Sequence, residues 1–587
     1  MNPFDTHEVR NTVAPLENFN LYAADPALRE AVRREGAGAH DEALHALGAQ
    51  LGRAETLDLA RLANQHPPTL HNFDRAGNRI DEVEFHPAWH ELMALLIENG
   101  AHASPWLGGA GAQVARAARY LMFGQVENGV QCPVTMTYAC VPALRQAPRI
   151  AAKWLPKILS MEYDPRSLPV EQKRGAIVGM GMTEKQGGSD VRANTTRAEP
   201  VPPQEARTLF GDDGEGVFRI VGHKWFFSAP QSDAHLILAQ TGAVDGLGGV
   251  GGDGAPAASS CAGLSCFFVP RFLPDGSRNQ IRVQRLKDKV GNRSNASSEV
   301  EFTGAHGWLI GKPGRGIPTI LEMGSHTRLD CVLGSAGAMR AALTHALHHA
   351  RSRHAFGRPL AEQPLMQNVL ADLALESEAA TAFAMRLARC FDEADDPAQR
   401  LLARILTPAG KYWICKRGPA FGAEAMEVVG GSGYVEESPL ARLYRELPVN
   451  SIWEGSGNVM CLDLLRAFGK TPAARDALAA ELGLAPVESG GAGGSGGEGD
   501  GIGNFLRYTQ ALLADLEQPQ GDEFGARRLA ERVVLAVQAG LLLRHAPYYV
   551  SSAFVASRLA REPGGAFGRL PAGVDCAAIL GRALVPA

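Results

Sequence analysis

The fold of this chain is constrained most strongly by a change of sequence pattern between about residues 180 and 305. Within this stretch, short alternating or β-branched runs are separated by glycine and proline, which is typical of strands and turns. On either side, apolar residues recur at three- and four-residue steps, as they do on one face of a helix. We therefore predict an α+β protein with helices first, then an antiparallel sheet or small barrel, then helices again.

This pattern also predicts individual elements and domains. Strands are predicted at residues 218–221, 235–239, 264–269, 281–283 and 299–302, and later helices at residues 338–352, 365–390 and 401–416. A Gly-rich hairpin insertion is expected at residues 242–263. The predicted domains are an N-terminal helical domain (1–178), a central β-domain (179–308), a helical bundle (309–470), a Gly-rich linker (471–503) and a helical C-terminal extension (504–587).

The composition is ordinary for a soluble protein and excludes few functions. Hydrophobic residues make up 45% and charged residues 21%, and a net charge of −5 can still conceal a local basic patch. The 9 cysteines include no C-x-x-C pair, which favours reduced thiols in the cytosol. No window reaches the roughly 18 apolar residues of a membrane span. We expect a cytoplasmic protein without a metal site or a membrane contact.

The clearest candidate for chemistry is the loop at residues 181–193, with the sequence GMTEKQGGSDVRA. Thr183 and Ser189 supply hydroxyls, and Gly187 and Gly188 let the backbone approach a ligand closely. Taken alone, such a loop is as often a polar turn as a binding site.

Two other segments carry similar ambiguity. The run GHKWFFS at residues 222–228 is an aromatic cluster, which is more often part of a core than of a cofactor site. Glu454 directly follows Trp453, and a carboxylate buried beside an indole loses solvation and becomes a stronger base. The alternative is a glutamate favoured by a helix dipole, with Ser456 or Asn458 as the N-cap.

Together these segments resemble the acyl-CoA dehydrogenase family. The loop fits that family's pattern of a small residue, an apolar residue, Ser or Thr, Glu and a Gly-Ser-Asp ending. Residues 353–357 fit its Arg-x-x-Phe-Gly motif, and residues 427–446 fit its second, glycine-containing pattern. The resemblance implies FAD as the cofactor, an acyl-CoA thioester as the substrate and Glu454 as the base that removes the α-proton.

The same resemblance implies a set of FAD-binding residues. Phe226 occupies the position of the family's flavin-stacking tryptophan, and Arg353 and the glycines after residue 429 would reach the cofactor of a neighbouring subunit. We therefore expect a homotetramer. The implied cofactor-binding residues are Met182, Thr183, Gly188, Ser189, Phe226, Phe227, Ser228, Arg353, Phe356, Gly430, Gly431, Trp453, Ser456 and Asn458.

This chain also departs from the family pattern in several places. Lys185 and Gln186 replace the usual Pro-Gly, and Pro364 replaces a glutamine that would meet the adenosine part of FAD. Trp453 replaces a common tyrosine, and its bulk is expected to narrow the acyl pocket toward short or branched chains.

Four stretches are similar to one branch of the family, the AidB-like proteins: residues 183–197, 222–240, 285–297 and 448–465. That branch implies DNA binding, a role in the response to DNA alkylation damage and weak dehydrogenation of isovaleryl-CoA. The alternative is a metabolic short- or branched-chain acyl-CoA dehydrogenase without a DNA role. A third possibility is a protein in which the flavin is only structural.

The C-terminal residues give independent support for DNA contact. From residue 524 onward there are eight arginines and three acidic residues, and an excess of arginine is consistent with phosphate binding. A solvated helical face or a subunit interface would give the same composition. Because helix-turn-helix and zinc-finger spacings are absent, double-stranded DNA would be bound without sequence preference, in the cytoplasm or nucleoid. The candidate DNA-binding residues are Arg466, Arg527, Arg528, Arg532 and Arg561.

Overall fold

The structure is a computed structural model that describes residue 4 and residues 6–242, 263–483, 501–517, 523–560 and 565–584. The chain forms two compact units, and each unit combines segments that are far apart in the sequence. Unit 1 contains Met1–Leu57, Ala110–Val126 and Cys331–Ala587, whereas unit 2 contains Asp58–Gly109 and Glu127–Asp330. The boundary predicted at residue 178 therefore does not separate the compact units, because the helices before it contribute to both.

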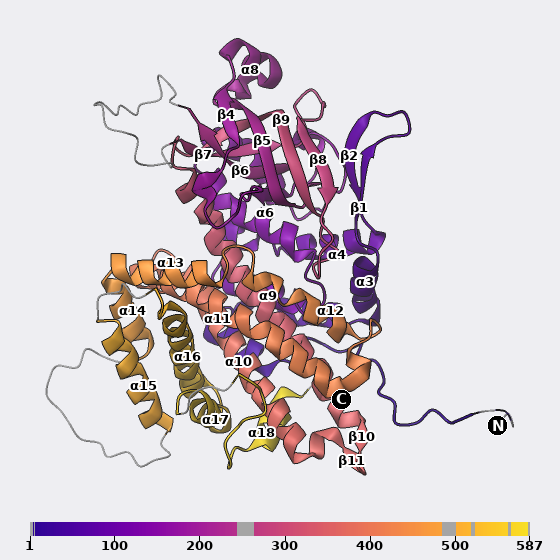
Figure 1. Cartoon of the computed structure of the whole chain (residues 1–587), viewed down its shortest axis with the longest axis vertical. Helices are drawn as coiled ribbons and strands as arrows, with labels where there is room; N and C mark the ends of the chain where they lie inside the picture. The colour runs from indigo at the N-terminus through magenta and orange to yellow at the C-terminus, as the bar shows by residue number, and fades with distance from the viewer. Residues whose placement is uncertain are drawn as a thin grey trace. The chain divides into compact units, whose positions relative to one another are not determined.

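Unit 2 is built around a seven-stranded sheet that closes into a small barrel (Figure 1). The strand order is β3-β6-β4-β5-β9-β7, β8 pairs with β9, and an additional pairing of β6 with β7 completes the ring. The strands are β3 (Val178–Gly181), β4 (Arg197–Pro200), β5 (Val217–Ser228), β6 (Ala234–Thr241), β7 (Leu264–Pro270), β8 (Ile281–Leu286) and β9 (Ser297–Ile310). The five strands predicted from the sequence all fall within these elements.

Two parallel pairings correct the expectation of a purely antiparallel sheet. Both β3 and β4 run parallel to β6 and lie end to end along the same edge of it, because β7 pairs along the other edge. The chain therefore leaves the sheet after β3 and returns to it in the same direction at β4, without the reversal that a tight hairpin would give. The segment that leads over from β3 to β4, residues 182–196, contains the Gly- and hydroxyl-rich loop and is named the crossover loop here.

The remaining elements of unit 2 include a hairpin that the helical pattern did not predict. Strands β1 (Thr69–Phe73) and β2 (Arg79–Glu84) pair antiparallel. The Asp74 carboxylate accepts hydrogen bonds from the backbone amides of Ala76 and Asn78, and Gly77 takes a positive φ of 86°. Such Asp-Gly chemistry is a turn signal within an otherwise helical region. The helices of this unit are α4 (Pro87–Glu98), α6 (Gln131–Leu144), α7 (Pro148–Ile158) and α8 (Pro203–Phe210).

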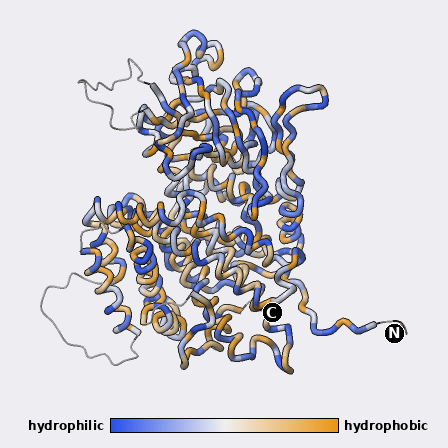
Figure 2. Tube along the Cα trace, in the orientation of Figure 1, coloured by the Kyte–Doolittle hydropathy of each residue, from blue (hydrophilic) through white to orange (hydrophobic). Residues whose placement is uncertain are grey.

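The described elements of unit 1 are helices apart from a short hairpin, and apolar and polar residues alternate along these helices (Figure 2). Two helices continue from one unit into the other: α3 (Ala54–Gln65) and α9 (Gly316–Ser352). The others are α1 (Pro26–Arg34), α2 (Asp41–Leu51), α5 (Ala112–Phe123), α10 (Pro364–Asp392), α11 (Pro397–Val429), α12 (Pro439–Glu446), α13 (Gly457–Lys470), α14 (Ala473–Glu481), α15 (Gly501–Asp515), α16 (Ala526–His545), α17 (Tyr548–Arg558) and α18 (Cys576–Ala583). The hairpin consists of β10 (His354–Ala355) and β11 (Arg358–Pro359).

The C-terminal extension belongs to the helical core of unit 1 and is not a separate appendix. Helix α16 packs on α10 and α11, and α18 packs on α10. The predicted linker at residues 471–503 is also wrong at both ends, because α14 lies inside it and α15 begins at Gly501. Residues 484–500 of that linker, and residues 243–262 of the predicted hairpin insertion, lie outside the described residues.

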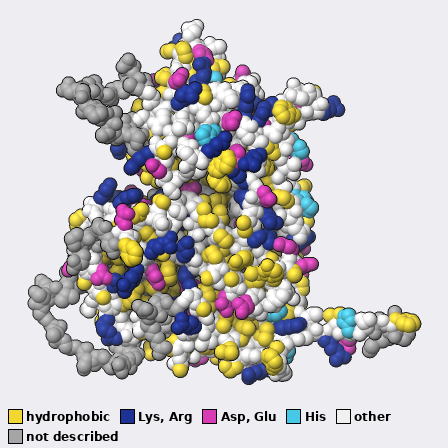
Figure 3. All heavy atoms as spheres, in the orientation of Figure 1, with side chains coloured by type: hydrophobic (Ala, Val, Ile, Leu, Met, Phe, Trp, Pro, Cys, Tyr) yellow, Lys and Arg dark blue, Asp and Glu magenta, His cyan; other side chains and the backbone are white. Residues whose placement is uncertain are grey.

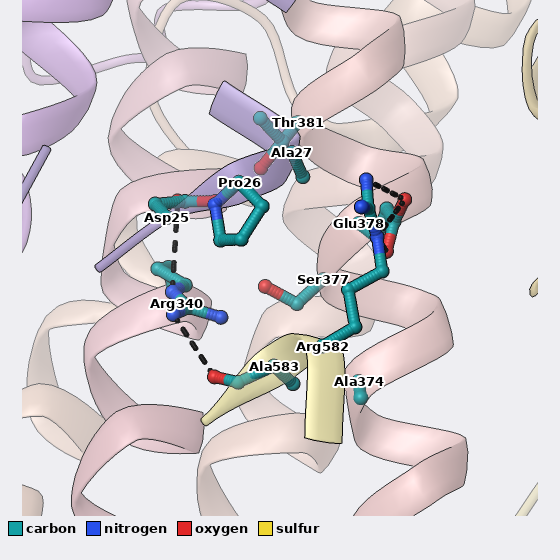
Figure 4. Close-up of a pocket in the computed structure, with 10 residues that line it drawn as sticks. All are labelled: Asp25, Pro26, Ala27, Arg340, Ala374, Ser377, Glu378, Thr381, Arg582 and Ala583. Atoms are coloured by element: carbon teal, nitrogen blue, oxygen red, sulfur yellow. Dashed lines mark hydrogen bonds and ion pairs between the residues drawn. The ribbon is translucent and has the colours of Figure 1, made fainter. Parts of the chain in front are cut away.

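Buried ion pairs fix the extension to helices α10 and α1 of the same unit. The Arg558 guanidinium pairs with both Asp372 and Glu376 on α10, with 3.2 Å from its Nη2 to Glu376 Oε2. Arg582 on α18 pairs with Glu378 on α10 and with Glu30 on α1, around a small polar pocket (Figure 4). Because both arginines are largely buried, their removal would take away the cations that pair with the buried Asp372 and with Glu378.

Replacing Arg558 should therefore destabilise unit 1. We expect Arg558→Ala to lower the free energy of unfolding by about 3–5 kcal/mol, since one side of a buried ion pair is lost. Urea denaturation followed by circular dichroism measures the change. Arg569→Ala, which removes an exposed arginine from the same extension, is the matched control. An equal effect of the two substitutions would show that the buried pair does not hold the extension.

Candidate active site

The crossover loop is anchored by a buried ion pair between Glu184 and Lys224. The Lys224 ammonium on β5 lies 2.8 Å from the Glu184 carboxylate, and neither side chain is exposed. Lys224 also donates a hydrogen bond of 2.8 Å to the carbonyl of Leu238 on β6. On its other side, Glu184 accepts hydrogen bonds from the backbone amides of Thr195 and Thr196 at the far end of the loop. One carboxylate therefore ties both ends of the loop to β5.

The charges of this pair determine how it responds to pH. Burial alone would raise the pKa of Glu184, but the Lys224 ammonium and the surrounding hydrogen-bond donors outweigh it and lower the pKa to about 2. Burial also lowers the pKa of Lys224, to about 8, although the carboxylate beside it acts in the opposite direction. The pair is therefore charged at neutral pH.

Lys185 and Gln186, which stand at the position of the family's Pro-Gly, form a tight turn after Glu184. Glu184 and Gly187 exchange backbone hydrogen bonds of 3.3 and 3.0 Å, and Gly187 takes a φ of 148° that favours glycine. The Gln186 side chain folds back and donates to the Glu184 carboxylate and to the carbonyl of Ala193. Gln186 thus stabilises the loop itself. Neither this role nor the Glu184–Lys224 pair could be predicted from the sequence pattern.

The four residues predicted from the loop lie together on it. A Cβ atom at Gly188 would come within 2.5 Å of Thr183 Oγ1, so the absence of a side chain lets the loop pass directly against this hydroxyl. The Met182 carbonyl accepts a hydrogen bond from Asn194, and the Thr183 carbonyl accepts one from the Trp225 amide. Thr183 is half-buried and Ser189 is exposed. The loop therefore presents two hydroxyls and a bare stretch of backbone, which fit a flat polar ring.

The aromatic strand β5 divides its two phenylalanines between a surface and the core. Phe226 is 53% exposed, whereas Phe227 is fully buried and stacks on His235 with 4.1 Å between ring centroids. The exposed ring of Phe226 is therefore the one of the two that is accessible to a ligand in this chain. The Phe227 side chain belongs to the core of the sheet, and its role in binding the cofactor stays a prediction. Ser228 is half-buried beside Ser297.

In unit 1, Glu454 lies in a short segment that precedes α13. It is half-buried, and its φ of 58° places it in the left-handed region, which is uncommon for a residue other than glycine. The indole nitrogen of the neighbouring Trp453 donates a 3.0 Å hydrogen bond to Asn450 Oδ1. The buried Lys411 on α11 donates to the carbonyls of both Trp453 and Gly455. The sequence feature that could have predicted this contact is the presence of a lysine in an otherwise apolar stretch of α11.

The two polar residues after Glu454 have different surroundings. Ser456 occupies the N-cap position of α13 and its carbonyl accepts the hydrogen bond from the Met460 amide. Asn458 is exposed, and its Oδ1 accepts a 2.9 Å hydrogen bond from Arg527 Nε. A predicted cofactor-binding residue and a predicted DNA-binding residue are thus bonded to each other.

The residues predicted to serve a neighbouring subunit lie on the surface of unit 1. Phe356, with a φ of 52°, is 96% exposed at the turn between β10 and β11, and Arg353 next to this hairpin donates to the carbonyl of Asn11. Gly430 and Gly431 follow α11, and a Cβ at either position would meet no atom within 4 Å. These residues are accessible to a group outside the chain.

The candidate DNA-binding arginines differ in exposure and in ion pairing, which the sequence alone did not indicate. Arg466, Arg527 and Arg528 are exposed, whereas Arg532 forms an ion pair with Asp515 and Arg561 lies outside the described residues. Arg544, Arg558 and Arg582 also pair with acidic residues of other segments. Figure 3 shows basic and acidic side chains interspersed on the visible face of this unit. The local excess of arginine is therefore partly neutralised by acids that are distant in sequence.

Among the described residues, no helix combines the length and the apolar character that crossing a membrane requires.

Comparison with known proteins now defines the class. The middle domain of acyl-CoA dehydrogenases matches residues 179–305, and the C-terminal domain of acyl-CoA dehydrogenases matches residues 314–469. The N-terminal domain of the adaptive response protein AidB matches residues 11–165. The barrel, the helical bundle and the order of these matches are those of an acyl-CoA dehydrogenase.

One relative narrows the class further. The chain is 55% identical to the Escherichia coli protein AidB over 478 residues, which cover 81% of this chain and 83% of that protein. The chain therefore belongs to the AidB-like branch of the acyl-CoA dehydrogenase family.

Two solved structures share the fold over nearly the whole chain. The apo form of Bd2924 is 28% identical with a TM-score of 0.77 and covers 91% of this chain and 100% of its own. The Caenorhabditis elegans protein ACDH-11, solved in complex with C11-CoA, is 24% identical with a TM-score of 0.77 and covers 94% of this chain and 93% of its own. The agreement with these structures extends well beyond the residues matched by the domain models.

The Glu184–Lys224 pair predicts an acid-sensitive contribution to stability. Because the pKa of Glu184 falls from 4.5 to about 2 on folding, its contribution is complete above pH 4.5 and is lost as the pH falls toward 2. We expect Glu184→Gln to destabilise the protein by about 3–5 kcal/mol at neutral pH. The difference from the wild type should shrink as the solution is acidified.

Urea denaturation of both proteins over a series of pH values tests this expectation. The exposed Glu199, replaced by Gln, serves as the control for loss of one carboxylate. A difference between wild type and Glu184→Gln that is the same at every pH would contradict the assignment.

Proposed function

We propose that the protein is an FAD-dependent acyl-CoA dehydrogenase of the AidB-like type that oxidises short, branched acyl-CoA thioesters such as isovaleryl-CoA at a low rate. The observation that carries this proposal is the rigid presentation of Glu454 beside Trp453 in a chain of this family. When bound, the flavin supplies the acceptor for the hydride that leaves the β-carbon of the substrate. The C11-CoA complex of ACDH-11 supports an acyl-CoA as the substrate class.

The crossover loop is proposed to bind the flavin ring. Thr183 and Ser189 would offer hydroxyls to its polar edge, and the bare backbone at Gly188 would allow close approach. The exposed face of Phe226 would stack against the ring, as an aromatic side chain does without an indole N–H. Met182 and Ser228 would border the same group.

Glu454 is proposed to remove the α-proton of the thioester. A half-buried carboxylate has fewer water molecules around it than an exposed one, which favours proton transfer from a weakly acidic carbon. Trp453 is held by Asn450 and would narrow the acyl pocket on one side. Short or branched chains would fit such a pocket better than long straight ones.

A homotetramer is proposed because part of the cofactor site faces outward. The nearly complete exposure of Phe356 is unusual for a large apolar side chain and favours a partner surface. Arg353 would hold the FAD pyrophosphate of a neighbouring subunit through its planar guanidinium. Gly430 and Gly431 would approach the same cofactor.

Binding of double-stranded DNA, and with it a role in the DNA alkylation response, is the second part of the proposal. The exposed Arg527 and Arg528 at the start of α16, together with Arg466 on α13, support it. Contacts of this kind are made with phosphates and carry no sequence preference. The protein would then work in the cytoplasm, in association with the nucleoid. Without DNA binding, the alternative of a purely metabolic acyl-CoA dehydrogenase would stand.

Glu454→Gln tests the catalytic part. Anaerobic mixing of the wild type with isovaleryl-CoA should bleach the flavin absorbance, and the variant should bleach about 100- to 10,000-fold more slowly while retaining its FAD. Glu42→Gln, an exposed substitution in the same unit, is the control. Bleaching at the wild-type rate by Glu454→Gln would exclude it as the base, and no bleaching of the wild type by any acyl-CoA would leave only a structural flavin.

Arg527→Ala combined with Arg528→Ala tests the DNA part. Loss of two phosphate contacts should weaken binding to any duplex sequence and reduce the slope of log K against log salt by about 2. Fluorescence anisotropy with a labelled duplex at several salt concentrations measures both quantities. Arg75→Ala removes an exposed arginine from unit 2 and is the control. Unchanged affinity and slope would remove these arginines from the proposed contact surface.

A further inference from the structure

Lys411 is a buried cation whose hydrogen bonds converge on the backbone around Glu454. Its side chain lies within α11 and the residue is only 1% exposed. The ammonium donates to the carbonyl of Trp453 at 2.6 Å and to the carbonyl of Gly455 at 2.5 Å. These are the carbonyls of the residues immediately before and after Glu454.

The backbone that Lys411 holds is one that a free chain would rarely adopt. Glu454 has a φ of 58° and Gly455 a φ of 101°, so two consecutive residues have positive φ. Glycine tolerates this conformation, but a glutamate in it is sterically disfavoured and persists only where surrounding contacts enforce it. Hydrogen bonds to the carbonyls on both sides of Glu454 provide such enforcement.

Neighbouring contacts fix the rest of the segment. Asn450 receives the Trp453 indole hydrogen bond and itself donates to Ser335 Oγ at 3.1 Å. Gly457, the first residue of α13, packs against Tyr412, where a Cβ would lie 3.3 Å from the ring. Trp453 and α13 are therefore positioned by other residues. The two carbonyls that flank Glu454 are the part of the segment held by Lys411.

A purely structural role would not require a lysine at this position. A buried ammonium has lost most of its hydration, and an apolar side chain of similar length would fill the same space without that cost. What an apolar side chain could not do is donate to two carbonyls at once. The chemistry that distinguishes lysine here is therefore directed at residues 453 and 455.

We infer that Lys411 is the positioning residue for Glu454: its ammonium holds the two flanking carbonyls and so imposes the left-handed backbone that aims the glutamate side chain. This inference rests on the proposed function for the identity of the base, but the mechanical role of Lys411 does not. A displacement of about 1 Å at a reacting group can reduce turnover about 100-fold. Loss of Lys411 should therefore lower kcat much more than it changes KM.

Three substitutions separate the possible roles of Lys411. Lys411→Met keeps the length of the side chain and removes every donor, whereas Lys411→Gln removes the charge and keeps an NH2 group that can donate. Lys416→Met, on the exposed side of the same helix, is the matched control. Each protein is examined with its FAD bound, by kcat and KM for isovaleryl-CoA, flavin content and hydrogen–deuterium exchange of the peptide that spans residues 449–460.

The expected result is that kcat falls in the order wild type, Lys411→Gln, Lys411→Met, with about a 100-fold loss in the last and little change in KM. Amide exchange in residues 449–460 should become faster in the same order, and flavin content should stay constant. Wild-type exchange in Lys411→Met would overturn the inference, whatever the activity. Equal loss of kcat in the Gln and Met variants would also overturn it, because hydrogen-bond donation would then be irrelevant.

The failure of the proposed function would look different. If Glu454→Gln retained full turnover, Glu454 would not be the base, yet faster exchange in Lys411→Met would still identify Lys411 as the residue that holds this segment. If Lys411→Met does not fold with bound flavin, Lys411→Gln supplies the same comparison, and an unchanged exchange rate and kcat in it would contradict the inference.

Discussion

The crossover loop depends on the ion pair between Glu184 and Lys224. The loop leaves the sheet between two strands that lie end to end along β6, so it stands outside the continuous ladder of backbone hydrogen bonds. Glu184 replaces that ladder, because a single carboxylate receives the Lys224 ammonium, two backbone amides and the Gln186 side chain. With these bonds in place, Thr183 and Ser189 are presented from a fixed backbone.

In unit 1, a buried lysine likewise stabilises the irregular segment that carries Glu454. Lys411 is buried like Lys224, but its partners are two carbonyls and not a carboxylate. In each unit, a buried lysine on a regular element stabilises an irregular segment that carries a reactive or binding group. Rigid elements therefore determine the geometry of segments that could not maintain it by themselves.

Much of the fold could be predicted from periodicity and turn residues. The strands around residues 218, 235 and 264 and the long helices after residue 338 were identified because their patterns are strong and local. The β1–β2 hairpin was missed because its two strands are short and lie within a helical region. The parallel pairing of β3 and β4 with β6 was missed because pairing partners are not encoded in the periodicity of either strand.

The candidate site could be predicted only in part, for a similar reason. Motif spacing indicated Thr183, Ser189 and Glu454, whereas Glu184, Lys224 and Lys411 act through contacts between residues about 40 positions apart. The burial of Phe227 was not predicted, because the motif does not state which of the two neighbouring rings faces the core. From the sequence alone, the number of arginines in the extension that carry an unpaired charge was overestimated. Their acidic partners, such as Asp372 and Glu376, lie far away in the sequence.

The most direct test of the central claim, that the crossover loop is a flavin cradle, is an FAD titration of the flavin-free protein. The wild type and Gly188→Ala are compared by the change in flavin fluorescence. The wild type should bind FAD stoichiometrically, and Gly188→Ala should bind it much more weakly, because the added methyl group would come within 2.5 Å of the Thr183 hydroxyl. Equal affinity of the two proteins, or a wild type that binds no flavin, would contradict the claim.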